Sequence, residues 1–175
     1  AARGGGTQAP GRGAALRAGA AHERQGDVDG ALARMRAVLE VAPDHAPALN
    51  FLGYLLAQSG RDLDEAERRV LRALQLRPDT GAFLDSLGWV YFRRGEYQRA
   101  VEALERAASL SPDEPVILEH LGDAYQRASR SEEAAGAWRR ALDMLALDPE
   151  SAEPPGQRAL LERKLKALPT RSSGR

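Results

Sequence analysis

The sequence contains no cysteine, and this absence excludes several kinds of chemistry. A chain without thiols has no disulfide framework, no thiolate metal site and no cysteine nucleophile. The sequence also lacks an apolar run near the ~20 residues of a membrane-spanning helix. Its longest apolar-rich stretch, LNFLGYLLA at residues 49–57, is shorter and includes Asn50. We therefore expect no transmembrane segment.

A net charge is missing as well, because 25 basic residues balance 25 acidic ones. The chain therefore has no overall field that would draw it to nucleic acid or to an anionic membrane. The balance is uneven along the chain: residues 13–155 carry 17 basic and 24 acidic side chains, whereas residues 156–175 carry six basic and one acidic. We interpret the basic end as a solvated terminus of an acidic body and expect no nucleic-acid partner.

Catalytic and metal-binding patterns are also absent. The three histidines, His22, His45 and His120, lie far apart, and none forms an HxH or HxxxH motif, the spacings typical of metal ligands on one element. The glycines at residues 4–6 are not followed by the GK[ST] of a phosphate-binding loop, and no serine has a recognisable His and Asp arrangement. The sequence thus predicts no catalytic residue, no metal and no cofactor, and we expect the protein not to be an enzyme.

What the sequence does contain is a repeat. The pair Leu-Gly occurs at residues 52–53, 87–88 and 121–122, which gives separations of 35 and 34 residues. Prolines follow with the same separations, at Pro43, Pro78 and Pro112. A fixed period in this range predicts stacked helical units rather than one layered core.

The period divides the chain into repeat units with distinct ends. Composition predicts disorder in the glycine-rich N-terminal segment and in the short tail. The last predicted helix has leucines at helical spacing with charges between them, and we expect it to cap the open end of the stack. The predicted segments are a disordered segment at 1–11, four units at 12–45, 46–80, 81–114 and 115–148, a linker at 149–155, the capping helix at 156–168 and the tail at 169–175.

Each unit has the pattern of a pair of packed helices. Apolar residues three and four apart define one apolar stripe per helix, and the glycine of each Leu-Gly pair leaves room for the partner helix to approach closely. Gly60, Gly95 and Ser129 stand where the first helix of a unit must end and the chain turn back. The aspartates that follow the three prolines are the predicted N-caps of the next helices: Asp44, Asp79 and Asp113.

The third unit carries the clearest motif. It has Leu84, Leu87, Gly88 and Tyr91 in its first half, then Ala100, Leu104, Ala107 and Pro112. This resembles the tetratricopeptide repeat, with its signature W-x2-L-G-x2-Y, then A-x3-F, then Pro over 34 residues. The resemblance implies an all-α solenoid of four antiparallel helix pairs in a right-handed superhelix, closed by a C-terminal capping helix. The first unit is degenerate, with alanines where the large residues belong.

Residues 25–168 also look like the C-terminal repeat block of large bacterial tetratricopeptide repeat proteins. Several members of that group are envelope lipoproteins that act as adaptors. Nearly every basic residue is Arg, which is consistent with a GC-rich bacterial genome, and the absence of an initiator Met predicts a trimmed N-terminus. The compartment stays open between the bacterial cytoplasm and the periplasm or envelope.

The resemblance implies that the first helices of successive units line a concave groove. Positions 2, 5, 9, 12 and 13 of these helices face it, which makes Trp89 and Tyr54 candidate anchors and leaves Tyr91 as a packing residue. Phe92, at position 12, lies either at the edge of the groove or under the neighbouring unit. Aromatic rings ringed by polar groups are typical of a peptide-binding surface. The predicted groove residues are Asn50, Tyr54, Gln58, Asp85, Trp89, Arg93, Glu119, Asp123 and Arg127.

The acids in this set predict the charge of the partner. Asp85, Glu119 and Asp123 would repel a carboxylate and favour a protein or peptide segment with an apolar anchor next to Arg or Lys. The hypothesis is therefore a non-catalytic scaffold or adaptor. Two alternatives stay open: a structural module that stacks or self-associates through the first unit, and an accessory region of a larger protein whose activity lies elsewhere.

Overall fold

A computed structural model describes residues 27–147 and 156–168 of the 175-residue chain. All regular secondary structure in these ranges is helical. The predicted segments at 1–11, 149–155 and 169–175 lie outside the described residues, as does the expected first helix of the unit at 12–45. The helices are α2 (Val28–Val41), α3 (Ala46–Ser59), α4 (Leu63–Leu76), α5 (Gly81–Arg94), α6 (Tyr97–Leu110), α7 (Pro115–Arg127), α8 (Ser131–Leu147) and α9 (Gln157–Lys166).

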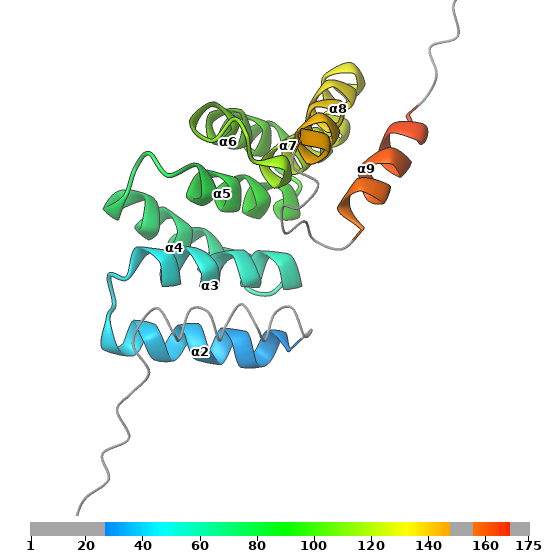
Figure 1. Ribbon diagram of the computed structural model, residues 1–175. Coiled ribbons are helices and arrows are strands. Elements are labelled where there is room, and N and C mark those ends of the chain that lie inside the picture. The colour runs from blue at the N-terminus through cyan, green and yellow to red at the C-terminus, as the bar shows by residue number, and fades with distance from the viewer. Residues whose placement is uncertain (1–26, 148–155, 169–175) are drawn as a thin grey trace, which may run out of the picture. The chain divides into compact units, whose positions relative to one another are not determined.

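The chain divides into two compact parts, residues 1–76 and residues 77–175. We call them unit 1 and unit 2, and they differ from the four predicted repeat units. Unit 1 contains the α3–α4 hairpin, with α2 packed against α3 (Figure 1). Its core follows the predicted three- and four-residue spacing, because Met35, Leu52 and Val70 are all fully buried. An ion pair between Arg72 and Asp44, 2.7 Å long, joins α4 to the turn before α3.

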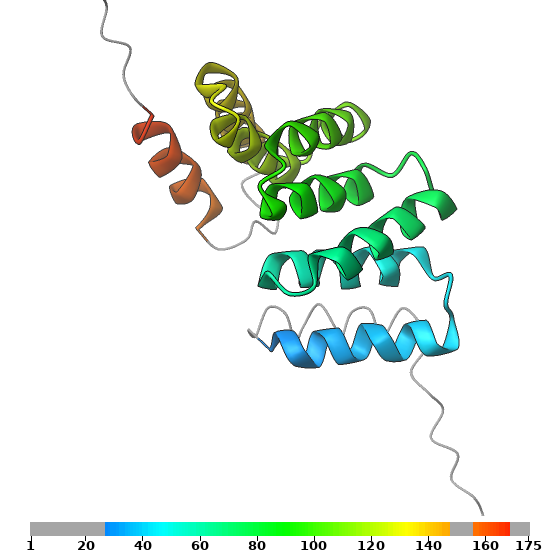
Figure 2. The same ribbon diagram turned by 180° about the vertical axis from the view of Figure 1, so that it is seen from behind.

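Unit 2 contains two hairpins, α5–α6 and α7–α8, and the shorter helix α9 (Figures 1 and 2). Helix α7 packs against both α5 and α6, and α9 packs against α8. Leu104, Leu118 and Trp138 are buried between these helices. The helix pairs are therefore observed within each unit, and the right-handed superhelix stays a prediction.

The Leu-Gly pairs mark the closest approach of paired helices. A methyl group added at Gly53 would lie 2.5 Å from Cγ2 of Val70, and one added at Gly88 would lie 2.5 Å from Cγ of Leu104. At Gly122 the added atom would collide with the indole of Trp138. Each hairpin thus uses the absence of a side chain to bring a large residue of its second helix against the backbone of its first.

The turns between paired helices lie at the residues that the sequence predicted. The predicted N-caps, in contrast, were wrong by one residue. Gly60, Gly95 and Ser129 all have left-handed backbones, with φ of 69°, 79° and 62°. The N-caps of α3, α5 and α7 are His45, Thr80 and Glu114 instead of the preceding aspartates Asp44, Asp79 and Asp113. His45 Nδ1 accepts a hydrogen bond from the Ala48 amide at 3.2 Å, and this leaves Asp44 free to pair with Arg72.

Two glycine substitutions in unit 2 test the close approach. Gly122→Ala should destabilise unit 2 by about 1–3 kcal/mol, because the buried Trp138 indole must move. Gly136→Ala should instead stabilise it by about 1 kcal/mol, because Gly136 is exposed on α8 with no atom within 4 Å of an added methyl group. Urea unfolding followed by tryptophan fluorescence measures both changes. Equal effects of the two substitutions would contradict this account of the Leu-Gly pairs.

Candidate functional site

The predicted groove residues lie on the first helix of each hairpin. In unit 1, Asn50 and Tyr54 are half-buried on α3 and Gln58 is exposed; the Oδ1 atom of Asn50 is buried with no hydrogen-bond partner among the described residues. The other six lie in unit 2, where α5 and α7 pack together. They are Asp85, Trp89 and Arg93 on α5 and Glu119, Asp123 and Arg127 on α7.

A continuous row of rings runs from His120 on α7 across α5 to Tyr97 at the start of α6. Trp89 stacks on His120, with ring centroids 4.4 Å apart, and on Phe92, with centroids 4.8 Å apart. Phe92 meets the edge of Tyr97 at 5.7 Å, and the guanidinium of Arg127 lies 4.6 Å above the Tyr97 ring. Trp89 is half-buried in this row, so it forms part of a wall rather than a free-standing anchor.

Asp85 faces inward, toward the next helix. Its Oδ1 lies 2.8 Å from Nδ1 of His120, and each side chain is only 11% exposed. Burial by itself lowers the pKa of His120, but Asp85, with smaller contributions from Glu119 and Asp123, outweighs burial and raises that pKa above its ordinary value. Asp85 therefore holds α5 to α7 and is not open to a ligand.

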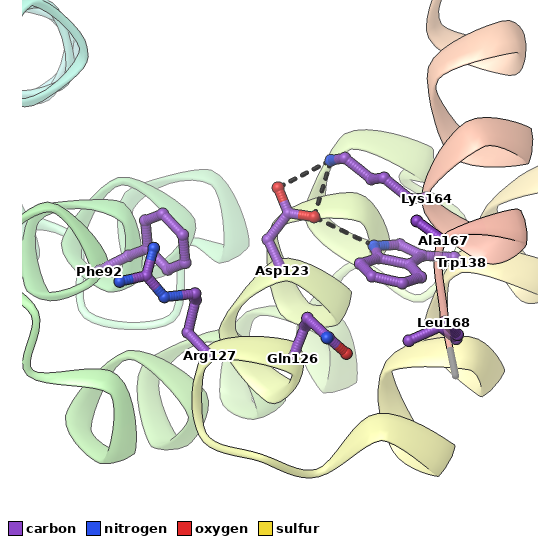
Figure 3. A pocket seen from close by; sticks show the side chains of 8 residues that line it. All are labelled: Phe92, Asp123, Gln126, Arg127, Trp138, Lys164, Ala167 and Leu168. Carbon is purple, nitrogen blue, oxygen red and sulfur yellow. Dashed lines mark hydrogen bonds and ion pairs between the residues drawn. The ribbon is translucent and has the colours of Figure 1, made fainter. Parts of the chain in front are cut away.

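The two acids of α7 are bound by α9. Lys164 Nζ lies 2.8 Å from Glu119 Oε1 and 2.7 Å from each carboxylate oxygen of Asp123 (Figure 3). Gln157 Nε2 donates to the other oxygen of Glu119 at 2.9 Å. Leu161, between these two residues on α9, is fully buried. Charge-assisted hydrogen bonds of this length are strong when they are shielded from water.

Trp138, on α8, fixes the orientation of Asp123. Its Nε1 donates to Asp123 Oδ1 at 3.1 Å and to the Glu119 carbonyl at 3.3 Å. Burial raises the pKa of Asp123, and the Lys164 ammonium partly offsets this increase. The Asp123 carboxylate is thus held between an indole and an ammonium group.

The sequence did not identify His120, Lys164 and Gln157 as the partners of the groove acids. Asp85 and Glu119 each stand at position 5 of a first helix. Asp85 on α5 bonds to His120 on α7, and Glu119 on α7 bonds to Lys164 on α9. The 35-residue separation of Asp85 and His120 was a usable signal, because it matches the repeat period.

A pocket of about 250 Å³ opens beside this cluster (Figure 3). Its walls combine rings and aliphatic groups with a few polar side chains, and they come from α5, α7, α8 and the C-terminal end of α9. The lining residues are Phe92, Asp123, Gln126, Arg127, Trp138, Lys164, Ala167 and Leu168. Of the predicted groove residues, only Asp123 and Arg127 line it.

Two polar side chains of the pocket have unused capacity for a hydrogen bond or an ion pair. The Oε1 atom of Gln126, which extends toward the space between α7 and Leu168 (Figure 3), is buried without a hydrogen-bond partner among the described residues. Arg127 is exposed and donates to the Tyr97 hydroxyl, but it forms no ion pair in the described part of the chain. The pocket therefore offers a buried acceptor and an accessible cation.

Within residues 27–147 and 156–168, no three His, Asp or Glu side chains are grouped so that they could hold a metal ion. In the same ranges, no helix combines the length and the apolar character needed to cross a bilayer.

Two family models match the chain: one described as Tetratricopeptide repeat, over residues 23–87, and one described as TPR repeat, over residues 88–129. A TPR repeat-containing protein of Pseudomonas aeruginosa is 42% identical over 72 residues, which are 41% of this chain and 12% of that protein. The chain therefore matches a small part of this relative.

Solved structures share the fold. MamA from Desulfovibrio magneticus has a TM-score of 0.63 at 20% identity, covering 81% of this chain and 78% of that chain. Another MamA crystal structure gives 0.61 at 22% identity, with coverage of 82% and 78%. An O-GlcNAc transferase mutant of Thermobaculum terrenum gives 0.62 at 26% identity, and there the match covers 81% of this chain but 28% of the transferase.

The Asp85–His120 pair predicts a pH dependence of stability. Because the folded-state pKa of His120 lies above its ordinary value of 6.5, protonated His120 stabilises the fold fully below that pH. This contribution is lost as the pH rises through the raised pKa. Urea unfolding between pH 5.5 and 9, followed by tryptophan fluorescence, should show unit 2 losing stability over the upper part of this range.

The control for this prediction is His120→Gln, which keeps a polar group beside Asp85 but cannot titrate. We expect the stability of this variant to change less with pH than that of the wild type. If both proteins showed the same pH profile, His120 would not be the titrating group.

Proposed function

We propose that this chain, which belongs to the tetratricopeptide repeat family, is a non-catalytic adaptor. It holds a segment of a partner protein against the α5–α7 face of unit 2. The repeats of this family are in general protein-interaction scaffolds. The pocket between α7, α8 and α9 is the anchor point of this surface. The remaining contacts follow the row of rings along α5.

The shape and lining of the pocket support a peptide as the ligand. Phe92, Trp138 and Leu168 provide apolar and aromatic walls, which is the composition found at the centre of protein interfaces. A volume of about 250 Å³ accommodates one side chain and its flanking backbone rather than a large cofactor.

The buried oxygen of Gln126 is the observation that carries the proposal. A buried acceptor without a partner is destabilising, and such groups in native proteins call for an explanation. The backbone N–H of an extended segment is a donor of the right kind, and it would bond to Gln126 once this side chain, which lines the pocket, turns toward the bound segment. The Pseudomonas aeruginosa relative, of which this chain matches one part, also contains TPR repeats.

A displayed library of random peptides, selected against the 175-residue protein, tests the proposal. Both tryptophans of the chain, Trp89 and Trp138, lie at the site. Titration of an enriched, fluorescein-labelled peptide should therefore change tryptophan emission as well as peptide anisotropy. A selection that enriches no peptide above background would overturn the proposed function.

Leu168→Ala and Leu147→Ala form a matched pair for locating the binding site. Leu168 lines the pocket, whereas Leu147 is 78% exposed at the end of α8. Leu168→Ala should weaken binding of the enriched peptide by about 1 kcal/mol or more, roughly fivefold in Kd, and Leu147→Ala should leave it unchanged. Equal affinities of the two variants in the anisotropy titration would place the peptide elsewhere.

A further inference from the structure

The two acids of the α7 face are paired with a basic group of the same molecule. Glu119 and Asp123 are 13% and 18% exposed, and both bond to the single ammonium group of Lys164, which is itself 20% exposed. Lys164 reaches them from α9, 45 and 41 residues further along the chain. A positively charged group from a partner would have to displace this ammonium before it could pair with either acid.

The cation at the edge of the pocket is in the opposite situation. Arg127 is exposed, and its guanidinium contacts Tyr97 through the hydroxyl group and the ring face. No carboxylate among the described residues pairs with it. Its contact with the ring orients the guanidinium while leaving part of its charge accessible. Of the charged side chains that line the pocket, Arg127 and Lys164 are cationic and Asp123 is anionic, so the lining keeps an excess of positive charge.

We propose that the pocket selects a segment in which an apolar side chain stands next to Asp or Glu, and that Lys164 is the residue that sets this preference. The inference rests on the proposed function and specifies its partner. The apolar side chain enters between Phe92 and Leu168, and the neighbouring carboxylate pairs with Arg127. Lys164 acts as a positioning residue, because it pairs with both acids of α7 and holds α9 in place as one wall of the pocket.

This assignment reverses the charge expected from the sequence. The sequence shows three acids on the groove face and predicts a partner that carries Arg or Lys. In the structure, His120 binds Asp85 and Lys164 binds the other two acids. Removing the Lys164 charge would favour the expectation from the sequence, because Asp123 in the pocket lining and Glu119 beside it would then lack the ammonium group that pairs with them.

The test is a peptide selection run in parallel on four proteins. They are the wild type, Lys164→Met, Lys164→Arg and the control Lys166→Met, which makes the same charge change at an exposed position of the same helix. The readout is the ratio of acidic to basic residues among enriched peptides. Anisotropy titration of two enriched peptides, one acidic and one basic, follows on every variant. Circular dichroism and thermal melting record whether each variant keeps its helices.

The wild type, Lys164→Arg and Lys166→Met should all enrich acidic peptides. Lys164→Met should enrich basic ones, and the ratio of the two affinities should move by about two- to fivefold, the effect of one exposed charge pair. A further variant, Arg127→Gln, is used in the anisotropy titration only, where it should weaken binding of the acidic peptide and leave binding of the basic peptide unchanged. Should Lys164→Met lose helix content, the other two variants still test the charge preference. A loss of acidic enrichment in Lys164→Arg, or unchanged binding of the acidic peptide by Arg127→Gln, would contradict it.

The outcomes separate the two proposals. If the wild type enriches no peptide, the proposed function fails and takes this inference with it. Peptides that bind the wild type and depend on Leu168, but are basic or show no charge bias, leave the function standing and overturn the charge preference. An equal shift in Lys164→Met and Lys166→Met would show that net charge, and not the Lys164 contacts, sets the preference.

Discussion

The site depends on the absence of one side chain. Gly122 lets the indole of Trp138 lie against the backbone of α7, where a Cβ atom would collide with it. From that position the indole donates to Asp123, and Asp123 in turn binds Lys164 of α9. The end of α9 then forms one wall of the pocket. A packing constraint between two paired helices is thus transmitted, contact by contact, to the wall of the proposed binding site.

The charges of this surface show why the acids read from the sequence give an incomplete electrostatic picture. The first helices of unit 2 place acids on one face, and an isolated helix with that face would attract cations. Folding gives every one of these acids a basic partner, an imidazole for Asp85 and one shared ammonium group for Glu119 and Asp123. What a ligand encounters is the charge that remains after this internal pairing.

Local features were predictable because they repeat. The period places the small residues where helices approach, and it places Gly60, Gly95 and Ser129 where a left-handed turn is required. Caps depend on one-residue differences in the turn, and there the sequence indicated the preceding aspartates. The Lys164 contacts lie beyond any repeat signal, since 45 and 41 residues separate Lys164 from its partners and neither distance matches the period. The predicted groove residues lie on the first helices of the hairpins, but the sequence did not identify the groups that bond to them.

The ionic links that join α5 to α7 and α7 to α9 have the same direction along the chain. In each, the carboxylate belongs to the earlier helix and the nitrogen base to the later one: Asp85 before His120, and Glu119 before Lys164. Exchanging the two hairpins in the chain would separate both acids from their bases. Consensus arrays are built from interchangeable modules, but here the order of the hairpins is itself encoded, because each one is complementary only to its own successor.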